Sequence, residues 1–419
     1  MHKTHQFGMN HLFECCGIEL EYMLVDRTSL DVKPLADRVL QAGSGAERPV
    51  NDYRRGELGW SNELVMHVLE LKNVKPGNDL ARLAQRFQDE VIAMNGELEP
   101  LGARLMPGGM HPWMNPAVET CVWPHDNSEV YRAYDRLFDC RTHGWANLQS
   151  THINLPFAGD DEFARLHAAL RVILPILPAL AAASPYAGGR AMHMLDYRME
   201  AYRTNAEAIP ELNGDIIPEH VISRLDYEQR ILQPMYRAVA PHDPQGVLRH
   251  EWLNARGAIA RFDRNAIEIR VLDTQECPGI DVAFAAVITD LAQMLCENER
   301  YSSGPDTLLP TATLADIFFA CTREAERARI GFSNYLQVFG MNREACEAGA
   351  LWEFIAERLD RENSPREAVW RPTMEYVLTR GSLARRLLRA VGPQPSHSDL
   401  HALYGALADS LQAGKPFDP

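Results

Sequence analysis

The 419-residue sequence has no CxxC pair and no zinc-type cysteine spacing, although it contains eight cysteines. Apart from the adjacent Cys15 and Cys16, these cysteines are scattered along the chain. Such scatter is typical of reduced thiols rather than of a disulfide framework or a thiolate metal site. Residues 1–10 also lack the apolar core of a signal peptide. We therefore expect a cytoplasmic protein.

Long hydrophobic runs are missing as well. The most apolar stretch, residues 170–183, is shorter than the roughly 20 residues that a membrane-spanning helix needs, and it contains Pro175 and Pro178. We expect a buried helix there, kinked by its prolines. The sequence therefore predicts no membrane partner.

Positive charge is scarce: 42 Lys and Arg stand against 57 Asp and Glu, for a formal net charge of −15. A field of this sign repels nucleic-acid backbones and anionic lipid surfaces. We therefore expect small-molecule substrates and no nucleic-acid partner. The 46% hydrophobic content is that of an ordinary globular protein, which leaves room for a large core.

The organisation of the chain changes at residues 302–311, which contain two Pro, one Gly and two Ser. Strand-like and helical patterns alternate before this stretch, and only helical patterns follow it. We interpret it as a linker between a catalytic domain, residues 1–303, and a helical region, residues 304–419, packed on that domain. A homodimer is compatible with this organisation, and the sequence does not decide the oligomeric state.

The motif Gly17-Ile18-Glu19-Leu20-Glu21 has the alternation of a β-strand. Its two carboxylates project from one face with their Cα atoms about 6.6 Å apart. They either lie on a solvated strand face or bind one or two divalent cations.

Three later strand-like segments also place polar groups where one face calls for apolar ones. They contain Glu63 with Glu70 in residues 62–73, His152 with Asn154 in residues 148–157, and Glu268 with Arg270 in residues 266–273. In the first of them, Glu63 and Glu70 are seven residues apart and so have opposite parity, and Glu63 joins Glu70 on one face only if the strand starts after Glu63 or bulges.

Together these segments predict one sheet face with four or five carboxylates, an imidazole and a guanidinium group. So much buried like charge calls for divalent cations, and an oxygen-rich, thiolate-free set favours Mg²⁺ or Mn²⁺. Several arginines follow the strands, and they are either a solvated face or a clamp for the phosphates of ATP. The candidates for ATP binding are Arg190, Arg198, Arg203, Arg256 and Arg261. Metal ions beside arginines are the equipment of phosphoryl transfer.

In their order along the chain, these motifs resemble the type 2 glutamate–cysteine ligases and related carboxylate–amine ligases of the glutamine synthetase superfamily. The resemblance covers about residues 14–300. It includes the loop Gly109-Met110-His111-Pro112 and the turn Ser184-Pro185-Tyr186. The role of His111, catalytic or structural, stays open.

This resemblance implies an α+β fold with a curved antiparallel sheet, flanked by helices, whose concave face holds ATP and two or three Mg²⁺ ions, as in the catalytic domain of glutamine synthetase. It implies that Arg270, beside Glu268, stabilises the transferring phosphoryl group. The metal ligands that it implies are Glu19, Glu21, Glu63, Glu70, His152 and Glu268.

The expected reaction is ATP-dependent phosphorylation of a carboxylate, first of all the γ-carboxylate of glutamate, followed by amide formation with an amine. Cysteine is the first choice for that amine. Two alternatives are a guanidino kinase of the same superfamily and a catalytically silent protein that binds metal or nucleotide.

Overall fold

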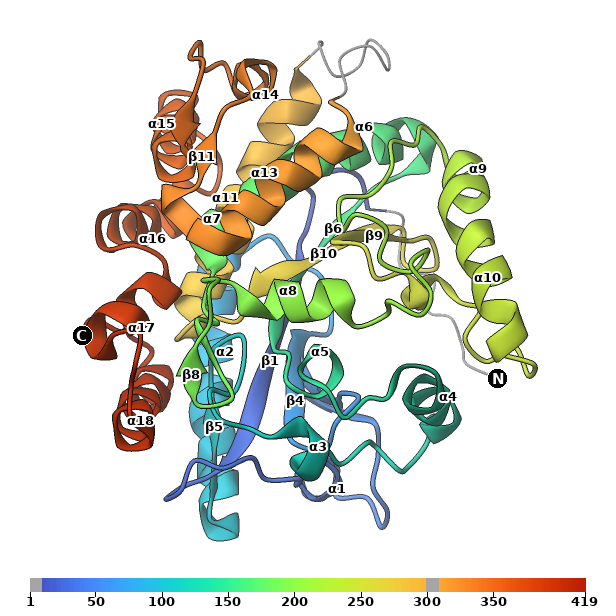
Figure 1. Ribbon diagram of the computed structural model, residues 1–419, viewed down its shortest axis with the longest axis vertical. Helices are drawn as coiled ribbons and strands as arrows, with labels where there is room; N and C mark the ends of the chain where they lie inside the picture. Colours follow the sequence, from blue (N-terminus) through green and yellow to red (C-terminus); the bar gives the residue numbers. More distant parts are fainter. Residues whose placement is uncertain (1–9, 299–308) are drawn as a thin grey trace.

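Strand β1 (Gly17–Asp26) lies in the middle of the sheet in the computed structural model, which describes residues 10–298 and 309–419 (Figure 1). Eight strands of the described chain form this sheet, in the order β2-β3-β4-β1-β6-β10-β9, with β5 pairing beside β1. All their pairings are antiparallel. The other strands of the sheet are β2 (Asp52–Arg55), β3 (Leu58–Asn62), β4 (Val68–Asn73), β5 (Ala103–Met106), β6 (Ser150–Pro156), β9 (Ala258–Arg261) and β10 (Ala266–Asp273).

An antiparallel sheet with flanking helices is thereby confirmed, and the closer likeness to the catalytic domain of glutamine synthetase stays a prediction. The main helices before the gap are α1 (Ala36–Ser44), α2 (Leu80–Leu98), α4 (Ser128–Phe138), α6 (Gly159–Ile173), α8 (Tyr197–Thr204), α10 (Gln233–Val239) and α11 (Pro278–Glu297). Shorter pieces are α3 (Pro116–Glu119), α5 (His143–Ala146), α7 (Pro178–Ala181), α9 (Arg224–Tyr227), β7 (Tyr186–Ala187) and β8 (Arg190–Ala191).

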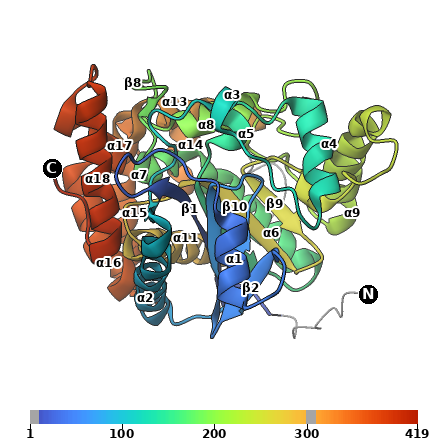
Figure 2. The ribbon, with the colours of Figure 1, turned by 90° about the horizontal axis from the view of Figure 1, so that it is seen from below.

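The two faces of β1 have different neighbours. Ile18, Leu20 and Tyr22 are fully buried in the main hydrophobic core, which α2 and α11 also line. Glu19 and Glu21 project from the other face because side chains alternate along a strand. Figure 2 shows α11 on one side of the sheet and α5 and α8 on the other. One face of the sheet is therefore core, and the other is available for a site.

The expected strand over residues 62–73 is wrong in its extent, since two strands of a hairpin, β3 and β4, share this region. Between them, residues 64–66 pair elsewhere: Met66 N donates to Cys121 O at 2.8 Å, and Trp123 N donates to Leu64 O at 2.9 Å. Glu63 thus lies on the connection, directly after β3, and β4 starts only after it. A strand that starts after Glu63 is one of the two arrangements expected to let Glu63 join Glu70.

Aspartate is a residue type that often caps a helix, but the aspartates near the starts of α6 and α11 do not. Helix α6 begins at Gly159, and α11 begins at Pro278 with Cys277 at the N-cap. The carboxylate of Asp281 accepts hydrogen bonds from Thr151 Oγ1 at 2.6 Å and Gln275 N at 3.0 Å. Its burial raises the pKa of Asp281 to about 8. Asp281 therefore ties α11 to β6.

Helix α11 is a longer apolar segment than residues 170–183, which we took from the sequence as the most apolar stretch. Among the described residues, it is the one helix whose length and composition would allow it to cross a bilayer. However, 89% of its most apolar window is buried inside the molecule, where it packs against β1, β6, α2 and α6. This burial is typical of a core helix.

The C-terminal part is mainly helical, with two short strands that the sequence did not indicate. Its elements are α13 (Thr311–Glu324), β11 (Arg329–Ile330), α14 (Ser333–Val338), β12 (Cys346–Glu347), α15 (Ala348–Arg361), α16 (Glu367–Arg380), α17 (Leu383–Val391) and α18 (His397–Ala413). Helix α16 packs on α11, and α18 packs on α2 and β5. Residues 302–308 of the expected linker lie outside the described residues, so the domain boundary at 303 stays a prediction.

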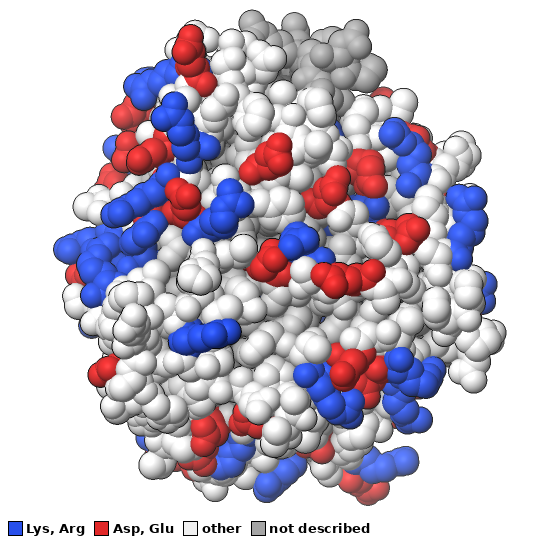
Figure 3. All heavy atoms as spheres, viewed as in Figure 1, with Lys and Arg blue, Asp and Glu red and all other residues white. Residues whose placement is uncertain are grey.

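The surface in the view of Figure 1 is mixed in charge. Figure 3 shows acidic and basic side chains interspersed over most of this face, with Lys and Arg densest along the left edge, where α16 and α17 lie. The excess of acidic residues in the chain therefore does not make this face uniformly negative.

His111 is a structural residue of the loop between β5 and α3. Its Nε2 donates to Leu30 O at 2.8 Å, and its Nδ1 accepts from Met114 N at 3.0 Å. Both nitrogens are thus used in the neutral ring, which is fully buried. Burial lowers the pKa of His111 from 6.5 to about 4.

We predict that His111→Gln shows this pKa difference in its stability. Between pH 6.5 and pH 4 the unfolded chain holds a proton at His111 that the folded chain excludes, so the free energy of unfolding of the wild type falls as the pH falls. Urea unfolding from pH 7.5 to pH 4.5 should show a wild-type advantage that shrinks by up to about 3 kcal/mol. A difference that stays constant over this range would show that His111 is not held neutral.

Candidate active site

The four strands that carry polar groups are neighbours in the sheet, in the order β4-β1-β6-β10. Their register brings the polar side chains together across the strands. Glu21 lies opposite Glu70, Glu19 lies opposite His152, and Glu268 lies opposite Asn154. Four patterns that are separate in the sequence thus meet on one face.

A cavity of about 330 Å³ lies over this face, and residues of α5 and α8 form part of its wall. It contains every residue that the resemblance implied as a metal ligand, together with Arg270. Its acidic, basic and hydrogen-bonding lining consists of Glu19, Glu21, Glu63, Glu70, Glu268, Lys72, Arg198, Arg261, Arg264, Arg270, His152, Ser150, Tyr202 and Asn205. Its other lining residues are Leu64, Val65, Val68, Trp145 and Leu148.

Two groups of three residues in this cavity have the spacing of metal sites. Glu19, Glu70 and His152 each offer one ligand atom, and these atoms lie within 4.8 Å of one another. The second group, Glu21, Glu63 and Glu70, meets the same limit. Glu70 belongs to both groups. We call Glu19, Glu70 and His152 the His152 triad, and Glu21, Glu63 and Glu70 the Glu63 triad.

Ser150 and His152, both on β6, connect the two carboxylates of β1. Glu21 Oε2 accepts from Ser150 N at 2.7 Å and from Ser150 Oγ at 3.1 Å. His152 Nε2 is 2.9 Å from Ser150 Oγ, and its Nδ1 is 3.3 Å from Glu19 Oε2. Burial lowers the pKa of His152, but the hydrogen bond with Glu19 and the charge of Glu21 outweigh it, so the pKa is raised.

At the end of the cavity formed by β1 and β4, burial makes Glu19, Glu21 and Glu63 costly to ionise, whereas Lys72 outweighs burial at Glu70 and lowers its pKa to about 2. Burial first, and then the charge of Glu70, raises the pKa of Glu19. Burial followed by the charges of Glu21 and Glu70 raises the pKa of Glu63 well above its ordinary value. The carboxylate of Glu63 accepts no hydrogen bond from the described residues. This end of the cavity therefore carries negative charge that the protein compensates only in part.

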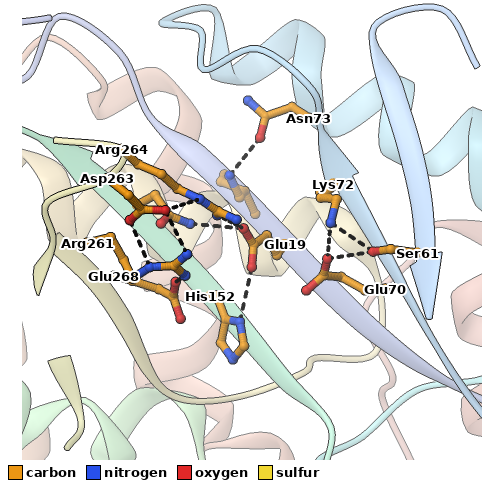
Figure 4. A network of polar contacts seen from close by, with 12 residues as sticks. Glu19, Ser61, Glu70, Lys72, Asn73, His152, Arg261, Asp263, Arg264 and Glu268 are labelled. Atoms are coloured by element: carbon orange, nitrogen blue, oxygen red, sulfur yellow. Dashed lines mark hydrogen bonds and ion pairs between the residues drawn. The ribbon is translucent and has the colours of Figure 1, made fainter. Parts of the chain in front are cut away.

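Glu268 has a different environment from the other carboxylates. Arg270 Nη2 donates to its Oε1. Arg261 Nη1 donates to its Oε2 at 3.2 Å (Figure 4). Although burial raises the pKa of Glu268, the charge of Arg270 and then those of His152 and Arg261 hold it well below its ordinary value. The expectation that the whole face needs cations for charge balance is thus corrected: Glu268 is neutralised by two arginines, and only the β1–β4 end has an excess of carboxylates.

The arginines proposed for ATP binding separate into two groups. Arg198 and Arg261 line the cavity, but Arg190, Arg203 and Arg256 do not. Arg190 is exposed on β8, Arg203 pairs with Glu200 of its own helix, and buried Arg256 pairs with Glu219 at 2.6 Å. Arg203 and Arg256 thus bind carboxylates outside the cavity, and Arg190 lies at the surface, which the spacing of arginines in the sequence does not reveal.

Arg198 is held by Asp273 at the end of β10. Its Nε donates to Asp273 Oδ1, while Asp273 Oδ2 accepts from Ala183 N and Ser184 Oγ, each at 2.7 Å. A Cβ on Gly109 would lie 2.4 Å from the Asp273 carboxyl carbon, so only glycine leaves room for this carboxylate. Arg198 Nη2 is buried without a hydrogen-bond partner, which leaves a donor for an anion.

The sequence reasoning missed several cavity residues. Lys72 lies two residues after Glu70, and the alternation along β4 was a signal that it shares the same face. Arg264, three residues after Arg261, lies 3.7 Å from Glu19. Trp145, Tyr202 and Asn205 come from α5 and the end of α8, and no local pattern shows that these segments reach the sheet.

The model of the glutamate–cysteine ligase family 2 matches residues 15–406 of the chain. The class that this match supports is the carboxylate–amine ligases. The chain belongs to the glutamate–cysteine ligase family 2.

Two relatives illustrate the range of similarity. The chain is 37% identical over 272 residues, 65% of its length and 72% of the relative's, to an Archaeoglobus fulgidus protein named "Uncharacterized protein". It is 28% identical over 280 residues, 66% of its length and 68% of the relative's, to a Rubrobacter xylanophilus protein named "Putative glutamate--cysteine ligase 2-3".

Among solved structures, the chain matches a bifunctional glutathione synthetase from Pasteurella multocida with 15% identity and a TM-score of 0.47. The match covers 96% of this chain and 52% of that one. This chain thus spans about half the length of that protein.

Glu63→Gln and Glu268→Gln should have opposite effects on stability in metal-free buffer. Glu63→Gln removes a carboxyl group that burial and the charges of Glu21 and Glu70 make costly to ionise, so the free energy of unfolding should rise. Glu268→Gln leaves two arginines without their carboxylate, so the free energy of unfolding should fall by about 3 kcal/mol. Urea unfolding measures both.

Glu57→Gln is the matched control, because Glu57 is 66% exposed and pairs with Arg86 at the surface. Its effect should stay within about 0.5 kcal/mol. A loss of stability in Glu63→Gln equal to that in Glu268→Gln would contradict the division of the cavity into an uncompensated end and a neutralised end.

Proposed function

We propose that the protein is an ATP-dependent ligase that phosphorylates the γ-carboxylate of glutamate and couples it to an amine, with cysteine as the first candidate. The observation that carries the proposal is the division of one cavity between the His152 and Glu63 triads on one side and a group of arginines on the other. Family membership supports the ligase class, and the name of the Rubrobacter relative supports the choice of substrates.

The donor set of the two triads fits Mg²⁺ or Mn²⁺. Five of its six places are carboxylates, counting shared Glu70 twice, the sixth is an imidazole, and no thiolate takes part. Glu19, Glu70 and His152 would hold one ion, and Glu21, Glu63 and Glu70 would hold a second. When bound, such ions supply positive charge for the phosphate oxygens of ATP.

Glu268 has a different role in this proposal from the metal ligand that the resemblance implied. Both its oxygens accept hydrogen bonds from arginines, and a metal ion would have to displace them. We assign to Glu268 the positioning of Arg261 and Arg270. These two guanidinium groups then face the cavity at a fixed place, where they neutralise charge on the transferred phosphoryl group.

The reaction needs a carboxylate and a phosphate group close together, and the arginines serve both. Arg198 Nη2 and Arg270 Nε are buried atoms without a hydrogen-bond partner in the described structure. We propose that they bind anionic oxygens of the substrates. The carboxylate oxygen attacks the γ-phosphorus and ADP leaves; the amine nitrogen then attacks the carbonyl carbon, phosphate leaves, and the nitrogen loses a proton.

We predict that ADP release requires glutamate and a divalent cation and is increased by the acceptor amine. The measurement is ADP release from ATP and glutamate with a panel of amines, together with mass detection of the amide. Excess chelator should abolish turnover, because the carboxylates of the triads would otherwise repel the phosphates.

Hydroxylamine separates this reaction from its alternative. With ATP, Mg²⁺ and glutamate but no amine, it should trap the acyl phosphate as a hydroxamate. The absence of a hydroxamate with any dicarboxylic amino acid, together with ADP release on a guanidino compound, would replace the ligase by a guanidino kinase.

A further inference from the structure

Lys72 places an ammonium group among the carboxylates of the β1–β4 end. Its Nζ donates to Glu70 Oε1 at 2.6 Å and to Ser61 Oγ at 2.8 Å (Figure 4). Ser61 Oγ also donates to Glu70 Oε1 at 2.8 Å. The three groups form a closed set of contacts, and the Lys72 side chain is only 33% exposed.

The register of the sheet explains why the ammonium lies there. Lys72 is opposite Glu19 across β1 and β4, and Ser61 is opposite Glu70 across β3 and β4. Alternation places Lys72 on the same face as Glu70. Lys72 therefore places its ammonium group between two carboxylates, in contact with Glu70 Oε1 at 2.6 Å and opposite Glu19 in the register.

No other described cation of the cavity serves this end as closely. Arg261 and Arg270 bind Glu268, and Arg198 binds Asp273. Arg264 is 52% exposed and 3.7 Å from Glu19. The four carboxylates Glu19, Glu21, Glu63 and Glu70, with Lys72, leave a formal charge of −3 at this end.

The contact with Lys72 falls on the residue that both triads share. Lys72 and Ser61 fix one oxygen of Glu70, and this limits the directions in which the carboxylate can turn. A shared carboxylate serves two ions only if its orientation suits both. Two divalent ions would change the local charge from −3 to +1, which is suited to an anionic nucleotide, whereas a third would leave +3.

We infer that Lys72 is the resident third cation of this site: it holds Glu70 for both triads and fills the place that a further divalent ion would otherwise take. The cavity therefore binds two divalent ions. This inference rests on the proposed metal-dependent function and assigns to Lys72 a positioning role in it.

The test is a Mn²⁺ titration followed by electron paramagnetic resonance, on the full chain without nucleotide. The wild type should bind two Mn²⁺ per chain. Lys72→Gln keeps hydrogen-bonding capacity and loses the charge, and Lys72→Met loses both, so each should bind three. Lys72→Arg keeps the charge and should bind two. Lys75→Met, at an exposed position three residues later, is the matched control and should bind two.

Turnover gives a second measurement. ADP release with glutamate and amine should fall at least about tenfold in Lys72→Gln, because misplacing one group of a constellation costs at least that much, and Lys72→Arg should restore most of it. If the wild type, Lys72→Gln and Lys72→Met all bind two Mn²⁺, the inference about Lys72 is overturned while the metal-dependent function stands. If the wild type binds no Mn²⁺, both are overturned.

Discussion

The site depends on one constraint: four carboxylates lie on a single face of a sheet whose other face is the main hydrophobic core. Because side chains alternate along β1, the residues that anchor this strand in the core, such as Ile18 and Leu20, also fix where Glu19 and Glu21 point. A shift of the register by one residue would bury the carboxylates and expose the core residues. Folding of the sheet and formation of the charged cavity are therefore the same event.

The protein compensates charge very unevenly across this cavity. On the β10 side, Glu268 is bound by two arginines, and Arg198 is bound by Asp273. On the β1–β4 side, Lys72 is the one closely held cation among the described residues for four carboxylates. An anionic substrate is attracted by the first side and repelled by the second. Binding of divalent cations on the second side would remove this asymmetry, which is how the proposed chemistry follows from the charge distribution.

Much of the candidate site was predictable from the sequence, because the alternation of side chains along a strand is a local property. It identified Glu19, Glu21, Glu70, His152, Glu268 and Arg270 as residues of strand faces, and the cavity contains all six. What sequence spacing did not show depends on distant partners. Arg256 pairs with Glu219, and Asp281 binds Thr151 rather than capping a helix. Ser61 reaches Glu70 only through the register of β3 and β4. The domain boundary and the likeness to glutamine synthetase stay predictions.

The central claim is that the two triads sharing Glu70 are metal sites. Anomalous diffraction from crystals grown with Mn²⁺ tests it most directly, because it locates the ions rather than their effects. The account predicts two peaks, one among Glu19, Glu70 and His152 and one among Glu21, Glu63 and Glu70, with Glu268 still bound by Arg261 and Arg270. Peaks on Glu268, or no peak at either triad, would contradict it.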